Sequence, residues 1–176
     1  MDEIVLAAMR KWPNVPHCHG WLALDARGDW YLRDEAAQHA GAFPAIKGSR
    51  IEHEGLKAFI RRNYLADDRG RWFFQNGPQR VYVQLEAAPW VWRVDASGER
   101  PAITSHTGRA AVPRGCWVDE AGRLFVDSDI GFGLVHSQDM VDAARAIEAG
   151  HWVPEPLRFA EAPGRFGFLL DPQAAS

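Results

Sequence analysis

The stretch DDRGRWFF, residues 67–74, has the composition of a tight turn that leads into a β-strand. The same pattern of Asp, two residues, Gly, one polar residue and three apolar residues occurs twice more, as DARGDWYL at 25–32 and DEAGRLFV at 119–126. An aspartate carboxylate accepts backbone amide hydrogens at the start of a turn, and glycine supplies its left-handed position. The three stretches therefore predict three β-hairpins, and these decide the fold class.

Alternation of apolar and polar residues extends the strand pattern beyond the hairpins. Along 80–86 the apolar residues point one way and the polar residues the other, and 90–94 continues the alternation. Three segments instead carry apolar residues at helical spacing: 2–12, the residues between a capping box at 49–52 and about 63, and about 138–149. The fold class is therefore α+β, with β-hairpin-rich antiparallel sheets and two to three amphipathic helices.

Segments with weaker patterns separate these elements. Residues 36–47 are expected to be irregular, and the polar stretch 99–113 to form a long loop or a weak edge strand. Residues 131–133, Gly-Phe-Gly, are expected to form a bulge or a turn into the following helix. Residues 166–170 are expected to form a closing strand.

The length of 176 residues suits one globular unit, 1–176, which can bury enough apolar surface to fold without a disulfide or a metal. The first and third hairpins each follow a Gly-Trp or Gly-Cys-Trp string and precede a helix. The simpler interpretation is one good turn used three times. The alternative is a duplication that gives two related hairpin-plus-helix lobes, 14–95 and 111–171.

Charge and hydropathy limit the classes of partner. A net charge of -3 provides no long-range attraction for phosphate backbones, so we expect no nucleic acid. The apolar runs are too short to cross a bilayer, so we expect no membrane. The N-terminus lacks the basic region and apolar stretch of an export signal. We therefore predict a cytoplasmic protein whose two cysteines, Cys18 and Cys116, are reduced thiols.

The middle of the chain resembles a proteobacterial family of uncharacterised proteins, a domain of unknown function. The resemblance spans about residues 28–94. It is carried by Gly48-Ser49-Arg50-Ile51, Leu56, Phe59, the turn Asp67-Asp68-Arg69-Gly70-Arg71, the strand Val81–Leu85 and Ala88-Pro89-Trp90. The resemblance implies a mixed fold and a bacterial cytoplasmic setting, and it implies no activity.

Eight tryptophans are the strongest departure in composition. One interpretation is that they fill the core of sheets that are joined by short turns. The other is an aromatic-lined groove between the lobes, because aromatic walls with a few polar groups are typical of small-molecule pockets. The ligand-binding residues of that groove are predicted to be Trp90, Trp92, Tyr82, Arg80 and Arg93.

The string His17-Cys18-His19 offers imidazole and thiolate ligands for a divalent transition metal. Neighbours in an extended chain point in opposite directions, so His17 and His19 can share a metal only with a remote ligand and without Cys18. A loop without metal is the simpler interpretation. Cys116, between Gly115 and Trp117, is expected to be a buried inert thiol.

These observations favour a non-catalytic module without a cofactor, which binds a small ligand or a protein partner in a regulatory role. The first alternative is a metal-binding protein or enzyme that uses His17, Cys18 and His19. The second is a structural protein that forms a homodimer through an exposed hairpin edge.

Overall fold

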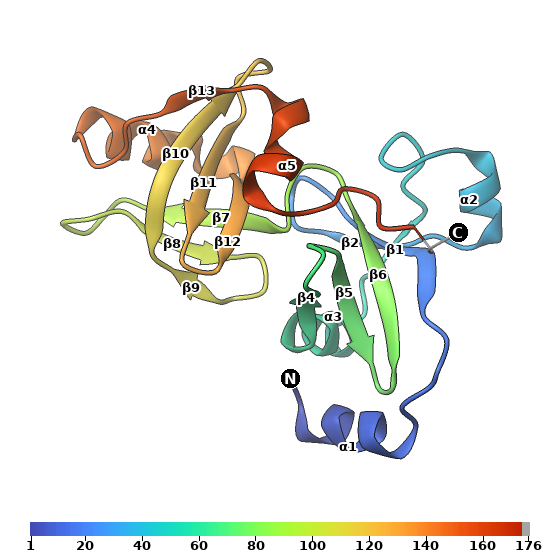
Figure 1. The fold of residues 1–176 in the computed structure, drawn as a ribbon. Helices are drawn as coiled ribbons and strands as arrows, with labels where there is room; N and C mark the ends of the chain where they lie inside the picture. The colour runs from blue at the N-terminus through green and yellow to red at the C-terminus, as the bar shows by residue number, and fades with distance from the viewer. Residues whose placement is uncertain (174–176) are drawn as a thin grey trace. The chain divides into compact units, whose positions relative to one another are not determined.

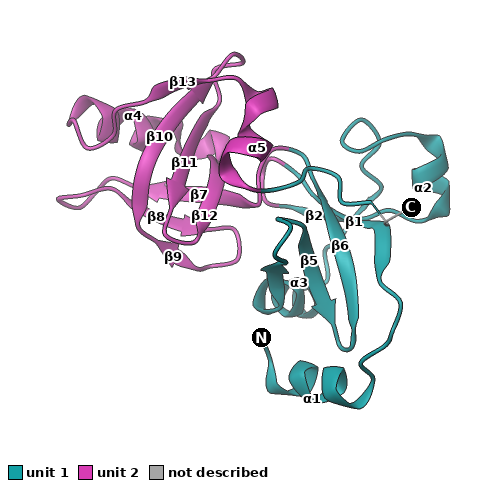
Figure 2. Ribbon diagram, in the orientation of Figure 1, with its two compact units in different colours: residues 1–25, 29–86, 168–176 teal, residues 26–28, 87–167 magenta. Residues whose placement is uncertain are grey.

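Two β-sheets dominate the computed structural model, which describes residues 1–173 (Figure 1). The described residues divide into two compact units: residues 1–25, 29–86 and 168–173 form unit 1, and residues 26–28 and 87–167 form unit 2 (Figure 2). Both sheets mix parallel and antiparallel pairs, and helices accompany them, so the predicted α+β class is confirmed. Among residues 1–173, no helix combines the length and the apolar character that crossing a membrane requires.

Unit 1 contains a six-stranded sheet and three helices. In chain order its elements are α1 (Glu3–Lys11), β1 (Cys18–Leu24), β2 (Trp30–Leu32), α2 (Glu35–Ala40), β3 (Ser49–Arg50), α3 (Glu54–Arg62), β4 (Tyr64–Ala66), β5 (Trp72–Asn76) and β6 (Gln79–Leu85). The strands lie in the order β3-β2-β1-β6-β5-β4, with β1 and β6 parallel. Helix α3 packs on β5, where the rings of Phe59 and Phe74 meet edge to face at 5.4 Å.

Unit 2 contains a seven-stranded sheet that curls into a half-barrel. Its elements are β7 (Trp90–Asp95), β8 (Ala102–Ser105), β9 (Ala110–Ala111), β10 (Pro113–Asp119), β11 (Leu124–Ser128), β12 (Gly131–Val135), the 3-10 helix η1 (Ser137–Asp139), α4 (Met140–Glu148), β13 (Glu155–Leu157), the 3-10 helix η2 (Phe159–Glu161) and α5 (Ala162–Phe166). The strands lie in the order β13-β10-β11-β12-β7-β8-β9, and the pairs β10–β13 and β12–β7 are parallel.

The three predicted hairpin turns share one geometry. The amide of the leading aspartate donates to the carbonyl four residues later at 3.0 Å in each turn, from Asp25, Asp67 and Asp119. The turn glycines have φ angles of 83°, 74° and 77°, the left-handed region that glycine tolerates best. In the second and third turns the aspartate also binds the arginine four residues later, with Nε–Oδ2 distances of 2.8 Å. The hairpin prediction is confirmed at all three places.

The helix predictions are confirmed in position and corrected in detail. Helices α1, α3 and α4 lie within the predicted segments. The expected capping box at 49–52 is wrong, because Ser49 and Arg50 pair with β2 and the His53 imidazole caps α3 by accepting from the amide of Leu56.

Three weakly patterned segments were assigned wrongly. Residues 36–47 are not wholly irregular, because the Asp34 carboxylate accepts from the amide of Ala37 and starts α2. Residues 131–133 belong to strand β12. Residues 166–170 form no strand, because α5 runs to Phe166 and ends at Gly167 in the left-handed conformation.

One connectivity occurs in both units. In unit 1 the antiparallel strands β1, β2 and β3 are followed by α3, and the later strand β6 lies parallel to β1 on its other side. In unit 2 the strands β10, β11 and β12 are followed by α4, and the later strand β13 lies parallel to β10 on its other side. This agreement fits the duplication, which stays a prediction.

Candidate binding site

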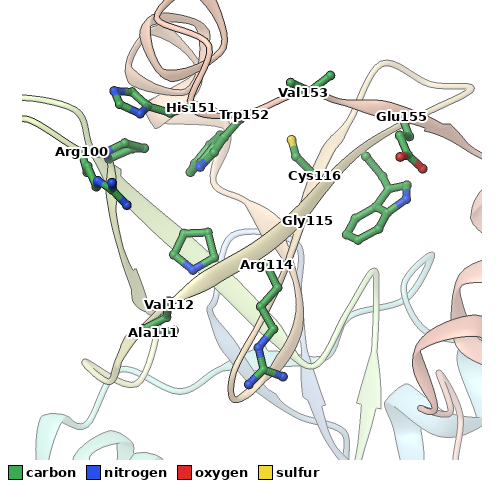
Figure 3. A pocket seen from close by; sticks show the side chains of 13 residues that line it. Arg100, Ala111, Val112, Arg114, Gly115, Cys116, His151, Trp152, Val153 and Glu155 are labelled. Carbon is green, nitrogen blue, oxygen red and sulfur yellow. The ribbon is translucent and has the colours of Figure 1, made fainter.

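A cavity of about 690 Å³ lies in unit 2 beside β10 (Figure 3). Its lining comes from three parts of the chain: Arg100 and Pro101, residues 111–117, and residues 151–153 with Glu155. The volume falls within the range of about 300–1,000 Å³ that is typical of small-molecule sites. The cavity therefore has room for a ligand of that size.

The charges of the lining are unevenly distributed. In Figure 3, Arg100 and His151 lie toward one end of the cavity and Glu155 toward the other, while Arg114 extends away from Cys116. Within residues 1–173, Arg100 takes part in none of the ion pairs that the structure contains. An exposed guanidinium without a carboxylate partner is an anion-binding group, so one end of the cavity favours negative charge.

Two exposed apolar side chains belong to the lining of the same cavity. Val112 is 63% exposed and Val153 is 75% exposed, and they come from different lining segments, as Figure 3 shows. Trp152, between the charged end and Val153, is buried. Exposed apolar residues around a cavity are typical of surfaces that bind a ligand or a partner.

Cys116 is the thiol of the lining, and it is buried and free. Burial raises the pKa of this thiol from 9.0 to about 11, because the thiolate loses its hydration. The group is therefore protonated near neutral pH and is a poor nucleophile. The structure agrees with the predicted buried inert thiol.

Strand β10 presents an open edge to the cavity. Its antiparallel neighbour β11 pairs along most of its length, whereas its parallel neighbour β13 pairs only with residues 117–119. Within the described part of the chain, residues 113–116 therefore have a strand partner on one side only. Such an edge carries backbone donors and acceptors that another strand can pair with.

The aromatic packing around β10 depends on a glycine, which leaves room for the Trp117 ring. The ring of Trp117 lies 4.9 Å from that of Phe166 and 6.2 Å from that of Phe132, measured between centroids. Gly115 leaves the space over which the Trp117 ring lies. Among residues 1–173 the structure contains no acceptor for the buried Trp117 Nε1, and a donor in that state destabilises a fold by about 1–3 kcal/mol.

Of the predicted groove residues in β7, Trp90 and Trp92 lie in the core of unit 2 and Arg93 lies on its surface. Trp90 and Trp92 are 2% and 0% exposed, and their Nε1 atoms donate to the carbonyls of Ile130 at 2.8 Å and Val126 at 2.9 Å. The interpretation that these tryptophans fill the core therefore holds for both. Arg93 binds the Asp139 carboxylate with two hydrogen bonds of 2.6 and 2.9 Å.

The other predicted residues gather in unit 1 around Tyr82. The His19 ring stacks on the Tyr82 ring at 4.7 Å, and the His17 ring meets it edge-on at 5.8 Å. The Arg71 guanidinium lies 4.7 Å from the centroid of the same ring, and Arg80 lies over Phe73 at 4.5 Å. Tyr82 is buried, so this cluster is a packed surface of aromatic and cationic groups around a tyrosine.

The histidines of this cluster are poor proton acceptors. Burial and the nearby Arg71 lower the pKa of His19, and burial and Arg80 lower the pKa of His17. Burial also raises the pKa of the Cys18 thiol. No three His, Cys, Asp or Glu side chains converge as metal ligands anywhere in residues 1–173. The metal interpretation of His17, Cys18 and His19 stays a prediction that lacks a third ligand in the described chain.

None of the eight residues singled out from the sequence lines the cavity of unit 2. The cavity is built from segments that were interpreted as loops or as the start of a hairpin, and its lining residues Arg100 and His151 stand outside any strand or helix. The sequence offered two short strings that the structure brings to this cavity, Arg-Pro at 100–101 and Trp-Val at 152–153. Both strings are short and common, so neither identifies a site alone.

Comparisons with known proteins agree with the fold and give no activity. A family model described as "Protein of unknown function (DUF2946)" matches residues 1–173. A DUF1285 family protein from Silicibacter pomeroyi is 15% identical, with a TM-score of 0.50 over 81% of this chain and 83% of that chain. A DUF1285 family protein from Shewanella baltica is 13% identical, with a TM-score of 0.47 over 72% of this chain and 91% of that chain. No curated protein matches the chain.

Proposed function

The chain belongs to this family of proteins of unknown function, and from that starting point we propose that it is a non-catalytic binding module whose ligand occupies the cavity of unit 2. The observation that carries the proposal is the cavity itself. It combines a volume of about 690 Å³, exposed apolar side chains in its lining and, at one end, an arginine that forms no ion pair within residues 1–173. Apolar walls with a few placed polar groups are the usual make-up of a ligand site.

The charge at the cavity end specifies the class of ligand. Arg100 offers a planar donor group that suits a carboxylate, and His151 adds a second polar group at the same end. Val112 and Val153 offer contact area to an apolar part of the same ligand. The ligand is therefore an organic anion that carries an apolar portion, either as a small molecule or as part of a protein.

Binding without conversion is supported by the state of Cys116. A thiol with a pKa of about 11 is almost wholly protonated at neutral pH, and covalent catalysis needs the thiolate. The proposal includes a bacterial cytoplasmic setting, in which Cys116 and Cys18 stay reduced.

A thermal-shift screen tests this function with three proteins: the unchanged chain, Arg100→Ala and Arg109→Ala. Arg109 is an exposed arginine of the same unit that does not line the cavity, so it controls for the loss of one positive charge. The ligands are aliphatic and aromatic carboxylates, with the matching amides and amines as controls.

A carboxylate at a hundred times its dissociation constant stabilises the fold by about 2.7 kcal/mol. For a chain of this size, that is a rise in Tm of about 5 to 10 °C. We expect the rise with carboxylates and not with amides, a smaller rise in Arg100→Ala, and no change in Arg109→Ala. A rise that is equal in all three proteins would exclude the cavity as the carboxylate site.

A further inference from the structure

The open edge of β10 has a defined length and position. Strand β10 has seven residues, of which β13 pairs with the last three. The remaining four, 113–116, run beside the cavity, which at about 3.3 Å per residue gives about 13 Å of strand edge. An extended segment of three to five residues spans that length.

The amide N–H of Cys116 points outward from this open edge of β10. The amide of Asp119 donates to the Arg123 carbonyl across the hairpin, so the N–H of Asp119 points toward β11. Successive residues of a strand point their amide N–H groups to opposite sides. The N–H of Trp117 therefore also points toward β11, and the N–H groups of Val118 and Cys116 point toward the side of β13. Since β13 begins at Glu155, opposite Trp117, no residue of β13 pairs with Cys116 through its amide. The Cys116 amide therefore points toward the side on which β13 has not yet begun, where an added strand can offer an acceptor.

The residues around the open edge of β10 could contact the side chains of an added strand. Side chains of an extended segment alternate between opposite faces, so one set enters the cavity and the other faces outward. Val112 and Val153 are exposed lining residues from two different segments and would contact apolar side chains of the added segment. Arg100 and His151 at one end would meet an acidic side chain.

We propose that the ligand of this cavity is an extended acidic segment of a partner protein, which adds a strand to the edge of β10 at residues 113–116 ahead of β13. This inference rests on the proposed function and names its ligand. Charge complementarity favours a segment with glutamate or aspartate over a basic one, because Arg100 is unpaired within the described residues. Strand addition is a common mode of peptide recognition, in which backbone hydrogen bonds supply affinity and alternate side chains supply specificity.

The test titrates ¹⁵N-labelled full-length protein with a capped hexapeptide in which glutamate and valine alternate. Two further peptides carry N-methyl groups on alternate amides, one on the odd set and one on the even set. Because alternate amides of a strand point to opposite sides, only one set faces β10. A capped peptide with lysine for glutamate tests the charge, and glutarate tests whether a small dicarboxylate is sufficient.

We expect the glutamate peptide to shift the amides of Val112, Arg114, Gly115 and Cys116, since Pro113 has no amide hydrogen, and to slow hydrogen exchange at Cys116 by about tenfold or more. One N-methylated isomer is expected to bind with the affinity of the unmethylated glutamate peptide. The other is expected to bind about tenfold more weakly, since the loss of one hydrogen bond lowers affinity by about that factor. The lysine peptide binds more weakly, and Arg100→Ala weakens the glutamate peptide while Arg109→Ala does not.

Equal binding of both N-methylated isomers, without protection of Cys116, overturns strand addition. If glutarate then still shifts the cavity amides, the proposed function stands and only this inference fails. If neither the peptide nor glutarate shifts those amides, both fail. Protection of Cys116 that rises with protein concentration in the absence of peptide also overturns the inference, because a second copy of the chain then occupies the edge.

Discussion

The indole of Trp117 lies over Gly115, two residues earlier in the same strand. A β-carbon at position 115 would stand 2.9 Å from Cζ3 and 3.0 Å from Cζ2 of that ring, closer than real side chains approach. The glycine therefore lets Trp117 pack against Phe166 and Phe132 while β10 runs past the cavity. Core packing and the shape of the candidate site depend on the same residue.

Gly115→Ala is expected to destabilise the protein by about 1–3 kcal/mol, because the Trp117 ring must move to relieve the overlap. The matched control is Gly164→Ala in α5, where a β-carbon meets nothing within 4 Å and alanine favours the helix by up to about 1 kcal/mol. Urea denaturation followed by tryptophan fluorescence measures both. Equal stability of the two variants would contradict the packing of Trp117 on Gly115.

Cys116 is expected to resist alkylation in the native protein. A shift of the thiol pKa from 9.0 to about 11 lowers the thiolate fraction at pH 8 by about a hundredfold, and burial slows access further. Mass spectrometry after iodoacetamide treatment should show slow modification at Cys116 in buffer and fast modification in denaturant. Fast native modification would show that the thiol is open and would remove the argument against covalent chemistry.

His19 is expected to titrate below the ordinary histidine pKa of about 6.5, because burial and the Arg71 guanidinium disfavour its charged form. The unfolded chain then binds this proton more tightly than the folded one. The contribution of His19 to stability is therefore full above pH 6.5 and is lost as pH falls from 6.5 toward the folded pKa.

Imidazole chemical shifts across this pH range measure the pKa directly. Arg71→Gln should raise the pKa of His19 toward its ordinary value, and Arg69→Gln, at an exposed turn position nearby, should leave it unchanged. A pKa of His19 above 6.5 in the unchanged protein would contradict the arrangement around Tyr82.

Asp119→Ala is expected to cost about 2–4 kcal/mol. The buried Asp119 carboxylate accepts from the amides of Ala121 and Arg123 and from Arg123 Nε, at 2.8 to 3.0 Å, and its loss leaves these donors without their acceptor. Asp95→Ala is the control, since that exposed carboxylate accepts from the amide and the side chain of Ser97, and its loss should cost less than about 1 kcal/mol. Similar losses from the two changes, measured by urea denaturation, would contradict the structural role of the buried turn.

The hairpins could be predicted because their determinants are local. An Asp-x-x-Gly turn carries its own hydrogen-bond acceptor and its own left-handed residue, so Asp67 and Gly70 specify the turn without help from the rest of the chain. The helix face of α1 could not be predicted in the same way. Its spacing groups Ile4, Val5 and Trp12, yet only Val5 is buried and the other two are exposed. Periodicity shows which residues share a face, and only tertiary contacts decide whether that face is covered.

The cavity could not be predicted, because it depends on a parallel pairing between distant segments. Trp117 in β10 lies opposite Glu155 in β13, and Arg100 comes from the segment before β8. No local pattern links these three positions. The tryptophans that attracted the prediction, Trp90 and Trp92, were conspicuous because a half-barrel core needs bulk, and their indole donors are satisfied inside that core.

The central claim is that the cavity of unit 2 is the ligand site, and amide shift mapping with glutarate and the alternating glutamate–valine peptide tests it most directly. The account predicts perturbed amides at Val112, at 114–116 and at 151–153, and these perturbations weaken in Arg100→Ala and persist in Arg109→Ala. Perturbations confined to His17, His19 and the residues around Tyr82 would contradict it and would move the site to unit 1.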